Sequence, residues 1–177
     1  MATNATGTGT REAGRRASAV RAVVPPDATD PVGSTLDDLH QVATALRQHV
    51  EHTVLRREDL TWTAFTILRL VWTGKRVETR RAAAAAGIAK ATLTGVADTL
   101  VSRDLMRRLE HPRDRRLVLL ELTTPGRRLV RRLLPAVQAE ESFALAPLTS
   151  TQLTQLGDLL GRVAAHMRSD EARLRRH

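Results

Sequence analysis

The 177-residue sequence predicts a mainly α-helical protein that carries one β-hairpin. Three observations predict this fold class. Apolar residues recur at steps of three and four along most of the chain after residue 34, which is the spacing of amphipathic helices. Residues 105–110 and 116–122 have the composition of short strands and flank a link that contains Pro and Asp. Residues 79–103 show two helical patterns separated by a glycine, which is typical of a helix-turn-helix.

The N-terminal part of the chain is expected to contain a tail and one long helix. Residues 1–33 are rich in Ala, Thr, Gly and Pro and lack sustained periodicity, so they are expected to form a disordered tail. Ser34 is a good N-cap, and the helix that it opens is expected to reach about Arg56 within a dimerisation segment at 34–60. The apolar residues of this helix form a narrow seam: Leu36, Leu39, Ala43, Leu46 and Val50.

Residues 61–123 are expected to form one lobe. A helix is predicted from Thr61 to Thr73, with Gly74 as its C-terminal stop. The three residues from Lys75 to Val77 are too few for a helix and favour a brief strand. Thr79 is expected to cap a short helix through Ala86, in which five consecutive alanines give a strong helix propensity.

Gly87 is expected to supply the turn between the two helices of the motif. The second of these helices is predicted from about Lys90 to Arg103. Small residues on the first helix allow the pair to cross closely, which is the helix-turn-helix arrangement. The hairpin, with its turn at 111–115, follows directly. A hairpin in this position is a wing, so the lobe is predicted to be a winged helix-turn-helix.

Residues 124–177 are expected to add two helices for dimerisation. Thr124 is expected to cap the first of them, with Pro125 at the first helical position, where a missing N–H costs little. Pro135 is expected to kink or briefly break this helix. A capping box at 149–152 opens the last helix. The complete order gives about six helices and one β-hairpin wing, an α+β variant of a mainly α fold.

The positive charge of the chain is concentrated in the winged lobe and the helix after it. The chain has a formal net charge of +9, and residues 73–132 alone carry 15 basic and 6 acidic side chains. Localised positive charge is expected for a protein with a polyanionic partner, most often nucleic acid. Because this charge coincides with the helix-turn-helix and the wing, double-stranded DNA is the expected partner.

The residues expected to contact DNA lie at the exposed start of the second helix of the motif, at the hairpin tip, and at the start of the first helix. They are Lys90, Ala91, Thr92, Thr94, Arg113, Arg115, Arg116, Arg80 and Arg81. The residues at the start of the second helix are expected to meet base edges in the major groove. An arginine at the hairpin tip fits a narrow minor groove, and Asp114 is expected to orient one of the hairpin arginines. Arginines at the start of the first helix are expected to position the protein on phosphates.

Two stretches resemble a known family. The run from Gly87 to Thr94, continuing to Asp98 and Leu100, resembles the recognition helix of the multiple antibiotic resistance regulator (MarR) family. The run from Asp114 to Arg116, followed by Leu-Thr and Gly downstream, is similar to the wing and exit of that family. The order of elements is similar from about residue 34 to residue 168. The chain departs from the pattern where Ala89 and Ala91 replace the usual Ser or Thr.

The resemblance implies a homodimeric transcription factor that binds a pseudo-palindromic operator and acts as a repressor. It also implies that the terminal helices form the dimer interface and that Arg116 enters the minor groove. The apolar seam at residues 36–50 and the apolar stripe of the last helix exceed what a small winged lobe needs to cover. This excess independently favours a homodimer.

A small-molecule effector is a further candidate partner. Regulators that this chain resembles often bind small aromatic acids between the dimer helices and the DNA-binding lobe. His40, Trp62 and Phe65 are candidates to line such a cleft, and Arg47 or Arg69 is a candidate to pair with a carboxylate. The competing role for Trp62 and Phe65 is core packing, since the chain holds only two Trp, two Phe and no Tyr.

Other classes of function receive less support. The absence of cysteine excludes disulfides and thiolate sites, and the cluster of His49, Glu51 and His52 is better explained by solvent-exposed histidines than by a metal site. No metal and no cofactor are therefore expected. No phosphate-binding loop or serine elbow is present, so the chain is not expected to be an enzyme. The chain lacks a signal peptide and a long apolar run, so a cytoplasmic location is expected.

One alternative to a sequence-specific regulator stays open. An architectural DNA-binding protein reads the backbone and the shape of DNA alone. The alanines at the start of the recognition helix favour this alternative, because they remove side chains that contact bases.

Overall fold

The computed structural model describes residues 31–169 and residue 174, apart from the side chain of Arg115. Most of the expected tail, residues 1–30, lies outside the described residues. The chain divides into two units after Ala43, so helix α2 (Pro31–Val50) begins in the first unit and ends in the second. None of the described helices is both long and apolar enough to cross a membrane.

Helix α2 begins four residues earlier than the sequence indicated. Its first residue is Pro31 rather than a residue after Ser34. Proline is tolerated at the start of a helix because its missing N–H would have no partner there. The hydroxyls of Ser34 and Thr35 donate to the carbonyl oxygen of Pro31, at 3.3 and 2.7 Å. Ser34 thus lies inside the first turn instead of capping it.

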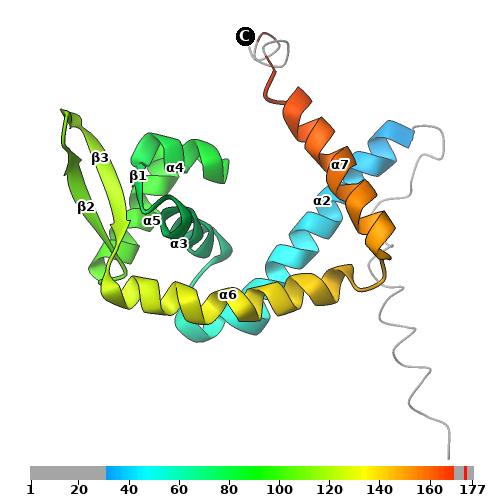
Figure 1. Cartoon of the computed structure of the whole chain (residues 1–177), viewed down its shortest axis with the longest axis horizontal. Helices are drawn as coiled ribbons and strands as arrows, with labels where there is room; N and C mark the ends of the chain where they lie inside the picture. Colours follow the sequence, from blue (N-terminus) through cyan, green and yellow to red (C-terminus); the bar gives the residue numbers. More distant parts are fainter. Residues whose placement is uncertain (1–30, 170–173, 175–177) are drawn as a thin grey trace, which may run out of the picture. The chain divides into compact units, whose positions relative to one another are not determined.

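The second unit contains the remaining elements (Figure 1). In chain order they are η2 (Glu51–Leu55), η3 (Arg56–Glu58), α3 (Trp62–Gly74), β1 (Arg76–Glu78), α4 (Thr79–Ala86), α5 (Lys90–Ser102), β2 (Met106–His111), β3 (Asp114–Leu122), α6 (Thr124–Leu145) and α7 (Ser150–His166). The three strands form one antiparallel sheet in the order β1-β3-β2. The described residues thus form six α-helices and a small sheet, which confirms the predicted fold class.

The core lies where α3, α5 and the first half of α6 meet the sheet. Its largest fully buried side chains include Phe65, Leu68, Leu93, Leu100, Met106, Leu120 and Val130. Helix α3 supplies the most continuous part, since Phe65, Ile67, Leu68 and Val71 are all inaccessible to solvent. The hydroxyl of Thr61 accepts a hydrogen bond from the backbone N–H of Ala64, so Thr61 caps this helix rather than forming its first residue.

Three helix ends differ from the expectation. Gly74 is the last residue of α3, and Lys75 takes the positive φ expected for the glycine. Thr79 does not cap α4, because β1 leads directly into the helix and Glu78 occupies the N-cap position without a side-chain bond. Helix α6 is capped by Thr123 rather than Thr124, because the Thr123 hydroxyl accepts from the N–H of Gly126 at 3.1 Å.

Helix α6 runs without interruption through Pro135, where a kink or a break was expected. Leu133 and Val137 on either side are buried, and their packing outweighs one lost backbone bond. Near its start, α6 passes very close to the chain before β2. A Cβ atom added at Gly126 would lie 1.9 Å from the carbonyl oxygen of Leu105, so only glycine fits there.

Candidate nucleic-acid interface

The turn of the helix-turn-helix is built by one glycine. Gly87 has a φ of 65°, in the left-handed region, and its N–H donates to the carbonyl of Ala84 at 3.2 Å. The N–H of Ile88 donates to the carbonyl of Ala83 at 3.1 Å. These two bonds satisfy the last carbonyls of α4 and fix the direction of the chain into α5. Ala83 is buried and lets the two helices approach closely.

Helix α5 turns one face to the core and leaves the other free. Leu93, Ala97 and Leu100 are buried, whereas all four positions expected to meet DNA are exposed. Those positions are Lys90, Ala91, Thr92 and Thr94. The hydroxyl of Thr94 donates to the carbonyl of Lys90 at 3.0 Å and keeps only its lone pairs and methyl group for another partner. Among the described residues, the side chains of Lys90 and Thr92 have no hydrogen-bond partner.

An ion pair connects the recognition helix to the wing. Arg108 on β2 donates from Nη1 to the carboxylate of Asp98 on α5, and its Nη2 lies 3.4 Å from the carbonyl oxygen of Thr94. The carboxylate of Asp98 is therefore engaged in a salt bridge. The pair connects the exposed face of α5 to strand β2 of the wing.

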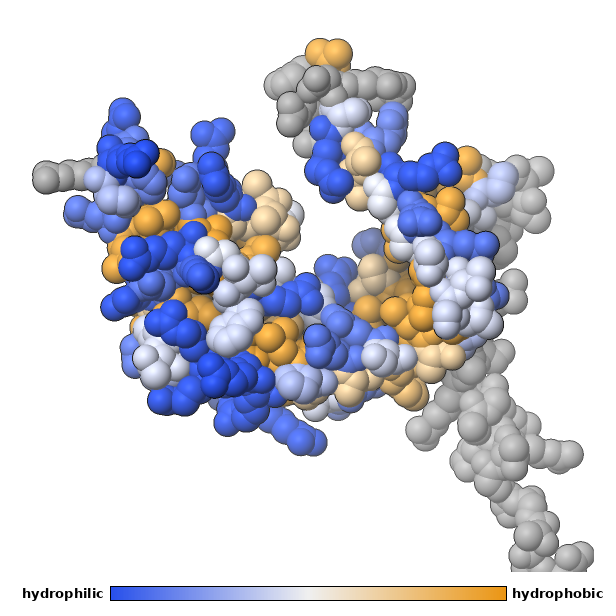
Figure 2. All heavy atoms as spheres, in the orientation of Figure 1, coloured by the Kyte–Doolittle hydropathy of each residue, from blue (hydrophilic) through white to orange (hydrophobic). Residues whose placement is uncertain are grey.

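The wing is a tighter hairpin than expected. Both strands extend further toward the tip than predicted, so Pro112 and Arg113 alone connect β2 to β3. The backbone N–H of Arg113 donates to Nδ1 of His111 at 3.3 Å, and the Arg113 side chain is exposed. Figure 2 shows the wing, at the upper left, covered by hydrophilic side chains. The side chain of Arg115 lies outside the described residues.

The carboxylate of Asp114 accepts three hydrogen bonds from Arg116. The backbone N–H and Nε of Arg116 donate to Oδ1 of Asp114 at 3.0 and 3.1 Å, and Nη2 donates to Oδ2 at 3.3 Å. The hydrogen bonds from Arg116 lower the pKa of the Asp114 carboxyl below its usual value. The Arg116 side chain is nevertheless 89% exposed. The wing therefore presents an oriented guanidinium to solvent, as the sequence suggested for a neighbour of Asp114.

The base of the wing contains a buried carboxylate that sequence reasoning missed. Glu121 on β3 is 7% exposed and accepts from Nε of Arg76 on β1 at 2.9 Å and from Nε of Arg107 on β2 at 2.7 Å. These two hydrogen bonds, that from Arg76 first, lower the pKa of Glu121. The register places Glu121 opposite both arginines. The opposite charges on predicted strands were the available signal, but the register was needed to pair them.

The two arginines at the start of α4 are both exposed, as expected for phosphate contacts. Nε of Arg81 lies 3.7 Å from a carboxylate oxygen of Glu78, and the Arg81 side chain is 79% exposed. Arg80 has no ion-pair partner among the described residues. Both guanidinium groups thus remain accessible.

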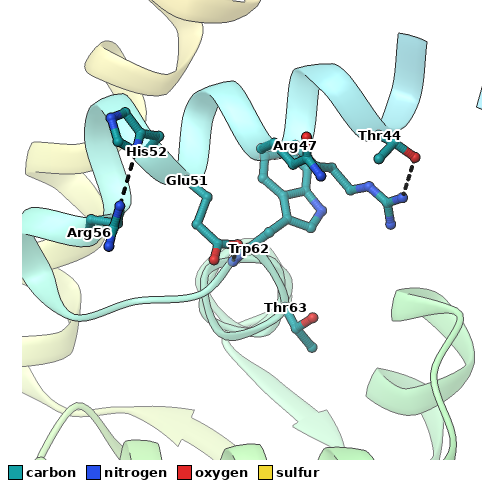
Figure 3. Close-up of a pocket in the computed structure, with 8 residues that line it drawn as sticks. Thr44, Arg47, Glu51, His52, Arg56, Trp62 and Thr63 are labelled. Atoms are coloured by element: carbon teal, nitrogen blue, oxygen red, sulfur yellow. Dashed lines mark hydrogen bonds between the residues drawn. The ribbon is translucent and has the colours of Figure 1, made fainter. Parts of the chain in front are cut away.

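A groove near the end of α2 contains two of the residues proposed to bind an effector (Figure 3). Its volume is about 550 Å³, and Arg47, Glu51, His52, Arg56 and Trp62 contribute to its lining. The backbone N–H of Trp62 donates to Oε2 of Glu51 at 2.8 Å, which joins the π-helical turn η2 to the start of α3. Arg47 donates to the hydroxyl of Thr44 at 3.2 Å.

The other three effector candidates lie outside this groove. Phe65 is fully buried, and the guanidinium of Arg69 lies 5.9 Å above its ring. Arg69 is also 3.7 Å from Glu141 on α6. His40 is exposed on the part of α2 that belongs to the first unit.

The histidines near the end of α2 differ in their surroundings. His49, expected to be solvent-exposed, is half-buried, with Nε2 2.6 Å from Oε2 of Glu140 and its ring stacked on Phe143. His52 is exposed beside Arg56. No group of three or more potential metal ligands occurs among the residues that the structure describes.

The terminal helices carry apolar side chains that the described chain does not cover. Helix α7 has no buried residue, and its leucines and valine at helical spacing are at least 37% exposed. They are Leu153, Leu156, Leu159, Leu160 and Val163. Figure 2 shows apolar surface along this helix. On α2, Leu36, Leu39 and Val42 are also exposed.

Comparisons with known proteins place these features in a family. Residues 60–118 match the model of the MarR family, and this range contains the helix-turn-helix and the tip of the wing. The chain is 34% identical over 134 residues to YwaE, an uncharacterised HTH-type transcriptional regulator of Bacillus subtilis. That alignment covers 76% of this chain and 78% of YwaE.

Solved structures agree with this match over most of the chain. AbsC, a MarR family transcriptional regulator from Streptomyces coelicolor, has a TM-score of 0.72 at 25% identity, covering 79% of this chain and 96% of AbsC. BpsR of Bordetella bronchiseptica has a TM-score of 0.67 at 26% identity, covering 80% of this chain and 98% of that one. The BpsR structure concerns the regulation of its DNA binding by 6-hydroxynicotinic acid.

Proposed function

The chain belongs to the MarR family of transcriptional regulators, and from this premise we propose that it is a homodimeric, sequence-specific regulator of a pseudo-palindromic DNA site. The observation that carries this proposal is that one lobe exposes polar side chains on both the recognition helix and the wing. Helix α5 exposes Lys90 and Thr92 without partners among the described residues, and the wing exposes Arg116 in a fixed orientation. The function is binding, with no catalytic step, and chromosomal DNA as the target places the protein in the cytoplasm.

Helix α5 enters the major groove in this proposal. The width of that groove admits an α-helix, and the first residues of a recognition helix meet the base edges. Lys90 donates to guanine or to a phosphate, and the hydroxyl of Thr92 donates to either. Thr94 offers its methyl group to thymine, since its hydroxyl hydrogen is engaged with the backbone. Ala91 contributes apolar contact.

Arg116 enters the adjacent minor groove. A narrow minor groove has an enhanced negative potential that attracts an inserted arginine. Because Asp114 already orients the guanidinium, less side-chain entropy is lost when it enters the groove. Arg113 and Arg115 at the tip, and Arg80 and Arg81 on α4, neutralise phosphates and position the protein without reading sequence.

The terminal helices form the dimer interface. Exposed apolar stripes of this size mark protein–protein contacts in soluble proteins. A two-fold axis through them sets two α5 helices about 34 Å apart, one turn of B-DNA. The protein is expected to sediment as a dimer at micromolar concentration, and a monomer there would contradict this part of the proposal.

The groove with Arg47 and Trp62 is the proposed effector site. It offers a guanidinium for a carboxylate and an indole for a flat ring. BpsR, whose DNA binding responds to an aromatic acid, supports an aromatic acid as the effector class. Arg69, Phe65 and His40 are kept as secondary candidates, although buried Phe65 requires a rearrangement to reach a ligand. The effector is proposed to release a repressor from its operator.

The experiment that tests the proposal compares specific and non-specific DNA. Fluorescence anisotropy at about 150 mM salt measures binding to the DNA upstream of the protein's own gene and to a scrambled duplex of equal composition. Sites enriched from random genomic fragments extend the comparison to operators elsewhere. A preference of about a thousandfold or more is expected for a sequence-specific regulator. Equal binding to every duplex would instead indicate an architectural protein.

A further inference from the structure

The winged lobe has two covalent connections to the rest of the second unit. The chain enters the lobe through η2, η3 and a link at residues 59–61 that leads into α3, and it leaves through α6, which continues to α7. In the proposed dimer, α7 forms part of the interface and each lobe presents one recognition helix. The separation of the two recognition helices therefore depends on how each lobe is fixed at its two connections.

Arg103, at the end of α5, binds the first connection. Its Nη1 donates to the backbone carbonyl of Asp59 at 2.7 Å, and its Nη2 donates to the backbone carbonyl of Glu58 at 2.6 Å. Both carbonyls lie at the end of η3, where Asp59 has a positive φ of 48°. Carbonyls at a helix end lack partners within the helix, and the planar guanidinium supplies two donors to them. One side chain thus joins the recognition helix to the start of the link.

Glu58 joins the same place to the second connection. Its Oε2 accepts from Nη2 of Arg132 on α6 at 2.8 Å, while its backbone carbonyl is bound by Arg103. Leu129 and Leu133, which lie close to Arg132 in α6, are buried in the core, so this part of α6 is fixed in the lobe. The Arg132 side chain is 66% exposed, so solvent screens its ion pair. We expect Arg132 to contribute less than the two hydrogen bonds of Arg103.

The residues after α5 are bound separately to the start of α6. The hydroxyl of Thr123, the N-cap of α6, donates to the backbone carbonyl of Asp104 at 2.6 Å. The backbone N–H of Thr123 donates to the carbonyl of Leu105 at 3.3 Å. These bonds do not involve the Arg103 side chain. A substitution of Arg103 therefore releases the link while leaving α5 attached to α6.

We propose that Arg103, assisted by Arg132, sets the separation of the two recognition helices and thereby selects the spacing of the two half-sites. This proposal rests on the proposed homodimer and its pseudo-palindromic site. Arg103 lies about 20 Å along the helix from Lys90, so it is a positioning residue rather than a DNA contact.

The spacing of half-sites is a sensitive target for such a residue. One added base pair moves a half-site by about 3.4 Å and turns it by about 35° around the DNA axis. A lobe that is fixed at both connections cannot follow this change without losing contacts. A lobe that is released from the link follows it by a hinge movement.

The separation can be measured without DNA, because the chain contains no cysteine. In a Thr92→Cys protein, a nitroxide label on the new thiol places one probe on each α5 of the dimer. Pulsed dipolar spectroscopy then gives the distribution of distances between the two probes. A narrow distribution is expected with Arg103 present, and one about twice as broad in Arg103→Gln. Arg103→Lys, which keeps the charge but not the planar fork, is expected to lie between them.

Anisotropy titrations test the spacing itself. Three duplexes carry the enriched operator with its natural spacing, or with one base pair added or removed between the half-sites. The wild type is expected to bind the altered duplexes about tenfold more weakly than the natural one. Arg103→Gln is expected to reduce this discrimination to about threefold and to bind the altered duplexes more tightly than the wild type does. A loss of stability alone does not produce such a gain in affinity.

Two further variants of α6 act as comparisons. Arg132→Gln is expected to reduce the discrimination between spacings by less than Arg103→Gln does. Arg131→Gln is the matched control and is expected to leave it unchanged, since Arg131 is exposed and has no ion-pair partner among the described residues. The slope of log affinity against log salt is expected to be the same in Arg103→Gln and the wild type, because no phosphate contact is removed.

Three results would overturn the proposal. The first is a distance distribution in the wild type that is as broad as in Arg103→Gln, and the second is equal discrimination between spacings in the two proteins. The third is a fall of about 1 in the salt slope of Arg103→Gln, which would make Arg103 a phosphate contact. Circular dichroism checks the fold, and Arg103→Lys and Arg132→Gln replace Arg103→Gln if that variant does not fold. Failure of the proposed function differs from these results, since it gives a monomer or equal binding of operator and scrambled DNA.

Discussion

Helix α5 and the wing both face solvent in the same lobe, yet their exposed side chains are held in different ways. Apart from Lys90, the start of the outer face of α5 carries short side chains, and its N-cap, Ala89, makes no side-chain hydrogen bond. In the wing, charged side chains are fixed by partners. Asp114 holds Arg116, and Glu121 holds Arg76 and Arg107.

The difference indicates how much each region contributes to DNA recognition. The side chain of an oriented arginine has already lost its conformational entropy on folding, so less entropy is lost when it binds DNA and the affinity is higher. The alanines at the start of α5 offer shape and apolar contact but few donors. The wing is therefore expected to contribute more to specificity than it does in a protein with Ser or Thr at these positions of α5. Arg108, bound to Asp98, keeps the two regions in register.

The largest expected effect comes from breaking the base of the wing. Gly126→Ala places a methyl group in the space taken by the Leu105 carbonyl. The start of α6 must move away from the chain before β2, so the free energy of unfolding is expected to fall by about 3 kcal/mol. Urea denaturation measures this loss. Gly95→Ala on α5 is the control, because a Cβ atom there meets nothing within 4 Å and the helix is expected to gain slightly in stability.

The next effect concerns the carboxylate that joins the three strands. Glu121→Gln removes the charge from two arginine hydrogen bonds and is expected to lower the free energy of unfolding by about 1–2 kcal/mol at pH 7. Thermal denaturation followed by circular dichroism measures it. A Glu110→Gln control, at an exposed residue of β2, is expected to have little effect. An equal loss in both variants would show that Glu121 has no special role.

The same carboxylate predicts a dependence on pH. The pKa of Glu121 is lowered in the folded protein, so the unfolded chain takes up a proton at higher pH than the folded one. The stabilisation is complete above the unfolded value of about 4.3 and is lost as the pH falls through the lowered folded value. Denaturation at a series of pH values is expected to show this loss in the wild type and a smaller one in Glu121→Gln. If the free energy of unfolding changed with pH in the same way in both proteins, the pH dependence could not be assigned to Glu121.

A smaller effect is expected when Arg116 stays in place but loses its hydrogen bonds to Asp114. Asp114→Ala removes the hydrogen bonds that orient the guanidinium, and the affinity for the operator is expected to fall by about 1 kcal/mol. The midpoint of urea denaturation should change little, because the pair lies at an exposed tip. Anisotropy titrations at fixed salt measure the affinity. An affinity equal to that of the wild type would show that orientation by Asp114 is not needed.

An effect of similar size is expected at a phosphate contact. Arg80→Ala should weaken binding to operator and scrambled DNA alike, by about fivefold at 150 mM salt. It should also reduce the slope of log affinity against log salt by about 1. A change confined to the operator would mean that Arg80 reads sequence rather than the backbone.

Local signals in the sequence were sufficient for most elements of the fold. The capping box of Thr149 and Gln152 and the turn at Gly87 both depend on neighbouring residues, and the structure confirms both. The exposed positions of α5 followed from helical spacing alone. An arginine oriented by Asp114 followed from their closeness in the chain, and the structure shows that this arginine is Arg116.

Features that depend on long-range pairing were not predictable from the sequence. The Glu121 bridge needs the register of three strands, and the ion pair of Arg69 with Glu141 joins residues far apart in the chain. The strained Lys75 was missed because Gly74 is the residue expected to take a positive φ. Gly74 is instead required for close packing on Val77, which leaves the next residue to make the turn.

The division of recognition between α5 and the wing is tested most directly by one comparison of two variants. Anisotropy at about 150 mM salt gives the ratio of affinities for operator and scrambled DNA in Arg116→Ala and in Thr92→Ala. The account predicts that Arg116→Ala lowers this ratio by about tenfold or more and that Thr92→Ala lowers it several times less. A larger loss of specificity in Thr92→Ala than in Arg116→Ala would contradict it.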